Sequence, residues 1–122
     1  MAQDNIILSK SYKFAIRIVN LYKFLVEVKR EYVLSKQVLR SGTSIVANIE
    51  EAIGAQSTND FLAKLAIAYK EARETRYWIN LLKDTCFLNL DQFDSLLYDI
   101  EEIIKIIGKI QATTKKNKPS GV

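Results

Sequence analysis

The feature that most constrains this chain is its shortage of residues that break helices: its 122 residues include four glycines and one proline. β-Sandwiches and barrels need many tight turns, and glycine and proline form most of those turns. Apolar residues instead recur at steps of three and four over long stretches, which is the spacing of an amphipathic helix. The sequence therefore predicts an all-α protein with a few long helices and short connections.

Four segments show this spacing, over residues 9–30, 35–55, 59–87 and 92–113. Helices of similar length with short connections favour an antiparallel up-and-down four-helix bundle. A helical hairpin that dimerises and a three-helix core with a docked arm fit the same segments. We expect one domain over residues 1–114 and a flexible basic tail over residues 115–122, in which Pro119 ends the last helix at the latest.

The first segment carries more apolar surface than one core face requires. Its main stripe consists of Phe14, Ile18, Leu21, Leu25 and Val28, and a second stripe consists of Tyr12, Ile16, Val19 and Val26. The second stripe either covers the rim of the core or meets another subunit, and its extent favours a subunit interface.

The second segment contains a run of small residues around Gly42 that is unusual for a helix. A glycine inside a helix costs about 1 kcal/mol relative to alanine. Because small side chains let another backbone approach closely, we predict tight helix packing at Gly42. A break in the helix at this glycine is the alternative.

Charge is unevenly distributed along the chain, whose formal net charge is +4. Residues 1–49 hold eight basic and three acidic groups, residues 50–104 hold five basic and eleven acidic groups, and residues 105–122 hold five basic groups and no acidic one. This distribution favours head-to-tail packing between copies or an anionic partner on a basic face. Alternatively, the helices fold against each other and the charges mix on one surface.

Several residue types that carry catalytic and metal chemistry are scarce or absent. The chain has no histidine, which excludes histidine-dependent zinc sites and catalytic triads. The single cysteine, Cys86, excludes an internal disulfide and fits a core thiol near a helix end. Glu51 and Glu74 could meet across two helices and bind a divalent metal, although such carboxylates mostly have structural roles. We expect no enzyme activity, no metal and no cofactor.

Two other residues are expected to be structural, with Asn48 bonding across helices and Trp78 in the core. No apolar run approaches the roughly 20 residues of a membrane span. Asp4 stands where a signal peptide needs positive charge. We therefore expect a cytoplasmic protein with no membrane partner.

Basic side chains give the better indication of function, because they can bind phosphates without reading base sequence. The candidates are Lys10, Lys13, Arg17, Lys36, Arg40, Lys115, Lys116 and Lys118. Binding of RNA or DNA through them would depend strongly on salt. Exposed aromatic residues for base stacking are not evident, so recognition of single strands is less supported. A solvated basic face is the alternative.

Two stretches of the chain, SKQVLRSGTSIVANIEEA and FLAKLAIAYKEARETRYWINLL, resemble a known family. They are similar to the four-helix-bundle proteins encoded in intervening sequences of bacterial 23S ribosomal RNA genes, and the resemblance spans about residues 8–110. The polar and aromatic matches to the family pattern are Gln37, Arg40, Ser44, Asn48, Glu51, Glu74 and Trp78. The chain departs from the pattern at Ala52, where the family usually has glycine, and at Gly42, where it more often has alanine.

This resemblance implies a homopentamer of antiparallel bundles around a central channel, without enzyme activity. Relatives of the family include the accessory protein of diversity-generating retroelements, a basic protein that binds a reverse transcriptase and nucleic acid. We therefore expect a non-enzymatic homo-oligomer that binds nucleic acid through basic residues. The alternative is a scaffold that binds a protein partner such as a reverse-transcriptase-like enzyme.

Overall fold

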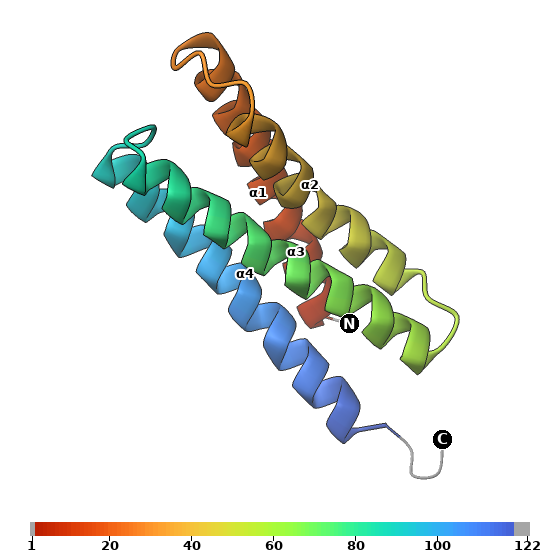
Figure 1. Cartoon of the computed structure of the whole chain (residues 1–122). Helices are drawn as coiled ribbons and strands as arrows, with labels where there is room; N and C mark the ends of the chain where they lie inside the picture. Colours follow the sequence, from red (N-terminus) through yellow and green to blue (C-terminus); the bar gives the residue numbers. More distant parts are fainter. Residues whose placement is uncertain (1, 119–122) are drawn as a thin grey trace.

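The computed structural model describes the backbone of residues 2–118 and the side chains from residue 6 onward, and this part of the chain is helical with short turns. The helices are α1 (Ala2–Glu27), α2 (Leu34–Ile53), α3 (Thr58–Asp84) and α4 (Leu90–Lys116). They run alternately up and down, so that neighbours in sequence are antiparallel (Figure 1). The predicted all-α fold with four helices is confirmed.

The ends of the helices differ from the predicted segments. Helix α1 begins seven residues before the predicted Ser9, and it ends before Arg30 because that residue adopts a left-handed backbone with φ 55°. In the same way, Cys86 with φ 69° follows the end of α3. Helix α4 continues past the predicted end at Thr113, so Lys115 and Lys116 belong to its last turn instead of to a tail. The rest of the predicted tail from Pro119 onward lies outside the described residues.

Side chains at the turns start the last three helices. The Ser57 hydroxyl accepts a hydrogen bond of 3.0 Å from the Asp60 backbone N–H, which caps α3. Asn89 and Gln92 form a reciprocal capping box at the start of α4, so Asn89 caps this helix. Helix α2 has no side-chain cap from Val33 and is instead capped by Glu31 from the preceding turn.

The core is built from the inward stripes of all four helices. Its fully buried large side chains are Phe14, Ile7, Ile18, Leu25, Ile45, Ile49, Leu65, Ile79, Leu82, Ile100, Ile103 and Ile107. Ile79 takes the inward position in α3, while its neighbour Trp78 is half-buried at the edge of the core. Ile53 is 45% exposed because it ends α2 beside the turn.

Gly42 of α2 packs directly against Ile18 of α1, and the helix continues through it without a break. A Cβ atom added to Gly42 would lie 2.7 Å from two side-chain atoms of Ile18, a distance at which atoms overlap. On the other flank of α2, the Thr75 hydroxyl donates a buried hydrogen bond of 2.9 Å to the Ser41 hydroxyl. The predicted tight packing is confirmed, and it explains why small residues occupy this segment.

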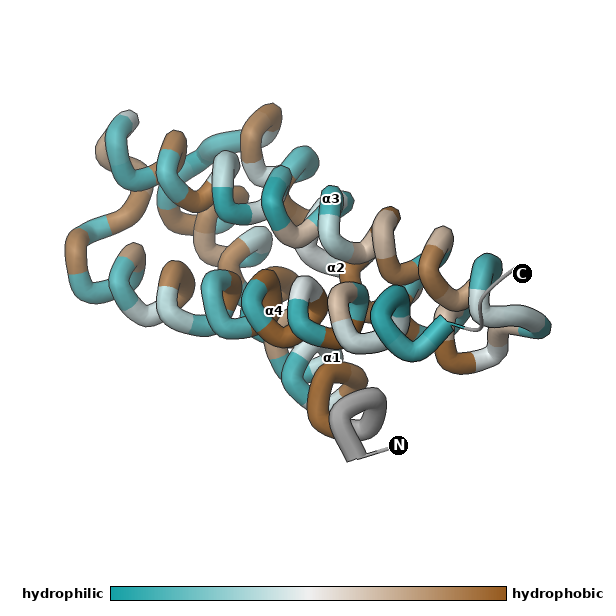
Figure 2. Tube along the Cα trace, turned by 90° about the horizontal axis from the view of Figure 1, so that it is seen from below, coloured by the Kyte–Doolittle hydropathy of each residue, from teal (hydrophilic) through white to brown (hydrophobic). Residues whose placement is uncertain are grey.

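Helix α1 is inclined to the other three helices, so it crosses α4 instead of running alongside it (Figures 1 and 2). Its second apolar stripe is not covered by the bundle, because Tyr12 and Ile16 are 61% and 48% exposed.

Within residues 2–118, no helix combines the length and the apolarity that crossing a membrane would require.

Candidate nucleic-acid interface

Two of the three predicted phosphate-binding residues of α1, Lys10 and Arg17, are engaged within the chain. Lys10 Nζ lies 2.7 Å from Glu102 Oε1, and this hydrogen bond holds the pKa of Lys10 above its usual value. Arg17 donates to Asp99 over 2.6 Å and to the Ser95 hydroxyl over 2.9 Å. Both interactions join α1 to α4. Lys10 and Arg17 therefore already have acidic partners on the neighbouring helix.

Arg40 is engaged in a similar way between α2 and α3. Its guanidinium donates to Glu71 over 3.0 Å and forms a short hydrogen bond with Glu74. The Trp78 indole N–H donates to the same Glu74 carboxylate over 2.9 Å. The hydrogen bond from Trp78 and the contact with Arg40 lower the pKa of Glu74, and the bond to Glu74 raises the pKa of Arg40. This cluster joins two helices and leaves little of the Arg40 charge for a phosphate.

The remaining residues of the family pattern lie along the flank of α2 that adjoins α3. Ser44 donates to the Arg40 carbonyl over 2.6 Å, and Asn48 donates to the Ser44 carbonyl over 2.8 Å, so Asn48 bonds within its own helix and the predicted bond across helices is wrong. Glu51 pairs with Lys64 over 3.1 Å, while Gln37 is exposed. These residues form a polar edge between two helices.

The predicted metal pair is not assembled, because Glu51 pairs with Lys64 while Glu74 binds Arg40 and Trp78. The described residues contain no group of three or more histidine, cysteine, aspartate or glutamate side chains that could hold a metal ion. Cys86 is exposed at the turn after α3, so the prediction of a core thiol is wrong. Its left-handed backbone, which the sequence does not reveal, turns the residue away from the core.

A basic surface does occur, on the outward side of α3 and α4 near the end of the chain. Tyr69 of α3 packs beside Gly108 of α4, and the Arg73 guanidinium lies 5.8 Å from the centre of the Tyr69 ring. Lys105 is one helical turn beyond Glu101, whose carboxylate lies 3.7 Å from Arg76 of α3. We define the basic surface as Lys70, Arg73, Lys105, Lys109, Lys115 and Lys116, all of which are exposed.

No acidic residue interrupts this basic surface along α4, because none follows Glu102 in the sequence. The acidic residues at the same level of α3 include Glu71 and Glu74, which face α2. At a rise of 1.5 Å per residue, the exposed lysines from Lys105 to Lys116 extend over about 16 Å of the helix. Positive side chains spaced along such a length can contact several phosphates of one strand.

The structure therefore brings together only part of the predicted set. Lys115 and Lys116 belong to the basic surface, and Lys118 follows it directly. Lys13 and Lys36 are exposed on other helices, and neither pairs with any acidic side chain that the structure describes. Lys70, Arg73, Lys105 and Lys109 were missed as binding residues, although the run of lysines after Glu102 without any acidic residue is visible in the sequence.

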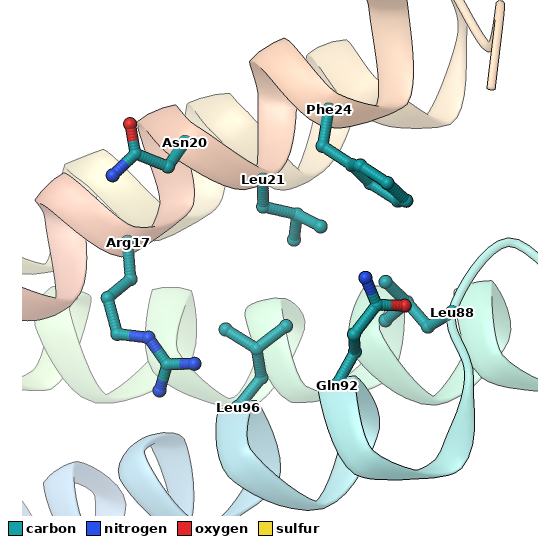
Figure 3. Close-up of a pocket in the computed structure, with 7 residues that line it drawn as sticks. All are labelled: Arg17, Asn20, Leu21, Phe24, Leu88, Gln92 and Leu96. Atoms are coloured by element: carbon teal, nitrogen blue, oxygen red, sulfur yellow. The ribbon is translucent and has the colours of Figure 1, made fainter. Parts of the chain in front are cut away.

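A pocket of about 290 Å³ with a mainly apolar lining lies between α1 and α4 (Figure 3). Leu21 and Leu96 point toward each other across it, and Phe24, Leu88 and Gln92 line the part near the α3–α4 turn. Arg17 lies at its rim and is held there by Asp99. Its lining suits an apolar group and offers no set of side chains for acid–base chemistry.

Comparison with known proteins adds a family match. A sequence model described as 23S rRNA-intervening sequence protein matches residues 3–109. The chain is also similar to a crystal structure of a protein with unknown function from the S23 ribosomal protein family of Bacteroides thetaiotaomicron VPI-5482. That match has 54% identity and a TM-score of 0.89, and it covers 90% of this chain and 98% of the other. A comparison with curated proteins gives no match.

Proposed function

The chain belongs to the family of 23S rRNA-intervening sequence proteins, and from this premise we propose that it is a non-enzymatic homo-oligomer that binds nucleic acid through the basic surface. The observation that carries the proposal is the division of the basic residues into two groups. Lys10, Arg17 and Arg40 are paired with acidic residues of neighbouring helices, whereas the basic surface is exposed and free of interspersed acids. An exposed cationic surface of this kind attracts phosphates.

Recognition through this surface would use the phosphate backbone. Tyr69, which lies beside the basic surface, is half-buried and has its ring covered by Arg73, so it offers little for base stacking. Lysines on one rigid helix fit a phosphate backbone of fixed geometry. We therefore propose structured RNA as the ligand. Binding would show little sequence preference and a steep dependence on salt.

The assembly that we propose is the homopentamer implied by the family resemblance. Its support on this chain is the uncovered apolar stripe of α1, where Tyr12 and Ile16 are about half exposed. Apolar stripes of this extent on a helical protein commonly mark an interface. Light scattering tests the assembly directly, because five copies of the 14.0 kDa chain give about 70 kDa and a monomer would contradict the proposal.

Fluorescence anisotropy with a labelled structured RNA, measured at two salt concentrations, tests nucleic-acid binding. We expect binding at low salt, and we expect Lys105→Gln combined with Lys109→Gln to weaken it and to reduce the salt slope by about 2. The matched control is Lys13→Gln combined with Lys36→Gln, which removes the same charge elsewhere. Absence of RNA binding at low salt would reject the proposed function. Equal losses of RNA affinity in the two double variants would reject the basic surface as the binding site.

A scaffold that binds a protein partner is the second candidate, and the pocket between α1 and α4 favours it. Its lining residues Leu21, Leu96 and Phe24 could receive an apolar side chain of a partner. Capture of a partner that survives nuclease treatment, and that is lost with Phe24→Ser, would support this function. Capture that nuclease abolishes would instead support the nucleic-acid function.

A further inference from the structure

The uncovered stripe of α1 combines apolar and basic groups in a regular order. Tyr12, Ile16 and Val19 are 61%, 48% and 36% exposed, and Lys23 continues the same line at a step of four. Positions separated by four, three and four residues lie one above the other on a helix. Lys23 is exposed and pairs with no acidic side chain among those that the structure describes.

A second exposed surface on the outward side of α4 has the opposite charge. We define the acidic face as Leu90, Asp91, Asp94 and Tyr98, which occupy neighbouring positions on the first turns of the helix. Leu90 and Tyr98 are 65% and 68% exposed. Asp91 and Asp94 are exposed as well, and neither pairs with a basic side chain in the described part of the chain. The acidic face thus combines large apolar side chains with unpaired carboxylates.

Contacts between α1 and α4 show that the two surfaces lie at the same level of the bundle. Arg17 bonds both Ser95 and Asp99, which places its neighbour Ile16 level with Tyr98. Because the two helices are antiparallel, residues that follow Arg17 in α1 lie beside residues that precede Ser95 in α4. Lys23 is therefore level with the region of Asp91. Ile16 and Tyr98 therefore share one level, and Lys23 and Asp91 share another, where the apolar Leu90 also lies.

The two surfaces also point in different directions. Arg17 marks the flank of α1 that faces α4, and the line from Tyr12 to Lys23 lies on the opposite, outward flank. The acidic face of α4 likewise points away from the seam between α1 and α4, which holds Asp99 and Glu102. A second copy placed alongside the first, with its axis parallel, can therefore bring one surface against the other.

We infer that the α1 stripe of one copy docks on the acidic face of the next copy. Ile16 packs against Tyr98 of the neighbour, and Lys23 lies beside the carboxylates of Asp91 and Asp94. A hollow of about 400 Å³ beside Leu8, Tyr12 and Glu50 gives space for large side chains at this contact. Because different surfaces meet, the contact is head-to-tail and each copy can bind two neighbours, which is how a ring forms. This inference rests on the proposed homo-oligomer and specifies its interface.

Site-directed cross-linking tests the docking between copies. We expect an equimolar mixture of Ile16→Cys and Tyr98→Cys, each in a Cys86→Ala background, to form cross-linked dimers under mild oxidation. The control mixture combines Tyr98→Cys with Asn59→Cys, an exposed position in the first turn of α3 that the docking leaves distant from α4. Equal cross-linking in both mixtures, or none in the first, would overturn the inferred interface.

Charge reversal provides a second test that does not depend on cysteine chemistry. Lys23→Glu and Asp94→Lys should each raise the concentration at which the oligomer dissociates about tenfold, and the two changes in one chain should restore it. Circular dichroism confirms that each variant is folded. A wild-type protein that is monomeric by light scattering would reject the homo-oligomer itself, whereas an oligomer indifferent to both reversals would reject only this interface.

Discussion

At the scale of single residues, Gly42 has less space around its Cα atom than Gly54 or Gly108. A side chain there would overlap Ile18, which is itself fully buried and cannot move aside. We predict that Gly42→Ala destabilises the protein by about 1 kcal/mol, because overpacking of about 1–3 kcal/mol exceeds the helix-propensity gain of about 1 kcal/mol. Urea unfolding followed by circular dichroism measures the change.

Gly108→Ala is the matched control, since it makes the same change within α4. Its added Cβ would lie 3.6 Å from the Tyr69 ring, which is an ordinary contact. We expect this variant to gain up to about 1 kcal/mol from helix propensity alone. A stabilising effect of both substitutions would mean that α1 and α2 can separate at Gly42 without cost.

Cys86 occupies a backbone conformation that favours glycine. It has φ 69°, the Phe87 N–H bonds the Leu82 carbonyl over 2.9 Å, and the Cys86 N–H bonds the Lys83 carbonyl over 3.0 Å. This is the Schellman arrangement that ends many helices. Because a left-handed residue with a side chain costs about 1–2 kcal/mol, we predict that Cys86→Gly stabilises the protein by about 1 kcal/mol.

Cys86→Ala separates this backbone effect from the loss of the thiol. Alanine keeps the steric cost of the Cβ atom, so this variant should unfold at nearly the same urea concentration as the wild type. An increase in stability for the alanine variant as large as that for the glycine variant would contradict the backbone explanation.

Single residues also show the limits of prediction from sequence. The tight packing at Gly42 could be predicted because a glycine within a strong helical pattern needs a compensating contact. The exposure of Cys86 could not, because cysteine gives no sequence signal for a left-handed backbone. Asn48 was misplaced for a related reason, since an amide in a helix can bond its own backbone as readily as another helix.

At the scale of helices, the start of α2 depends on one carboxylate from the preceding turn. Glu31 accepts hydrogen bonds from the backbone N–H groups of Val33, Leu34 and Ser35, the shortest of them 2.6 Å. Burial of the carboxylate opposes ionisation and is the largest single influence, but the backbone donors together lower the pKa of Glu31 below 4.5. The ionised form is therefore the one that stabilises the helix.

We predict that Glu31→Gln lowers stability by about 1 kcal/mol at neutral pH, as expected for loss of a helix cap. Since the folded pKa is lowered, the wild-type advantage is complete above the ordinary pKa of the carboxyl group and is lost as pH falls through the folded pKa. Urea unfolding at several pH values measures the stability difference between the wild type and Glu31→Gln. The control is Glu27→Gln, which replaces an exposed glutamate at the end of α1. A difference that persists unchanged into acid would contradict the role of the charge.

The existence of all four helices could be predicted, because each has a long apolar stripe with helical spacing. Their ends could not, because caps such as Glu31 and left-handed residues such as Arg30 act through backbone geometry. The basic surface was missed in part for the same kind of reason. Its formation depends on how α3 and α4 align at Tyr69 and Gly108, and sequence alone does not fix that alignment.

At the scale of the whole molecule, much of the charge separation along the sequence is cancelled within one chain. The basic residues Lys10 and Arg17 of the first half bind Glu102 and Asp99 of the second half across the seam between α1 and α4. Mixing of charges on one surface, one of the two expectations, thus accounts for this part of the pattern. The charges that remain for other partners include Lys13, Lys23 and Lys36, together with the acidic face and the basic surface.

The side chains of both ion pairs in this seam keep more than one-third of their exposure, which limits their contribution to stability. Arg17 and Asp99 retain 38% and 37% of their side-chain exposure, and such pairs are worth about 0–1 kcal/mol. We predict a coupling energy of about 0.5 kcal/mol for Arg17 and Asp99 in a double-mutant cycle with Arg17→Met and Asp99→Asn, measured by urea unfolding at about 0.05 M salt. About 0.5 M salt should reduce it because ions screen exposed charges. A coupling of several kcal/mol that resists salt would instead mean that this seam, and not the apolar core, holds α1 on the bundle.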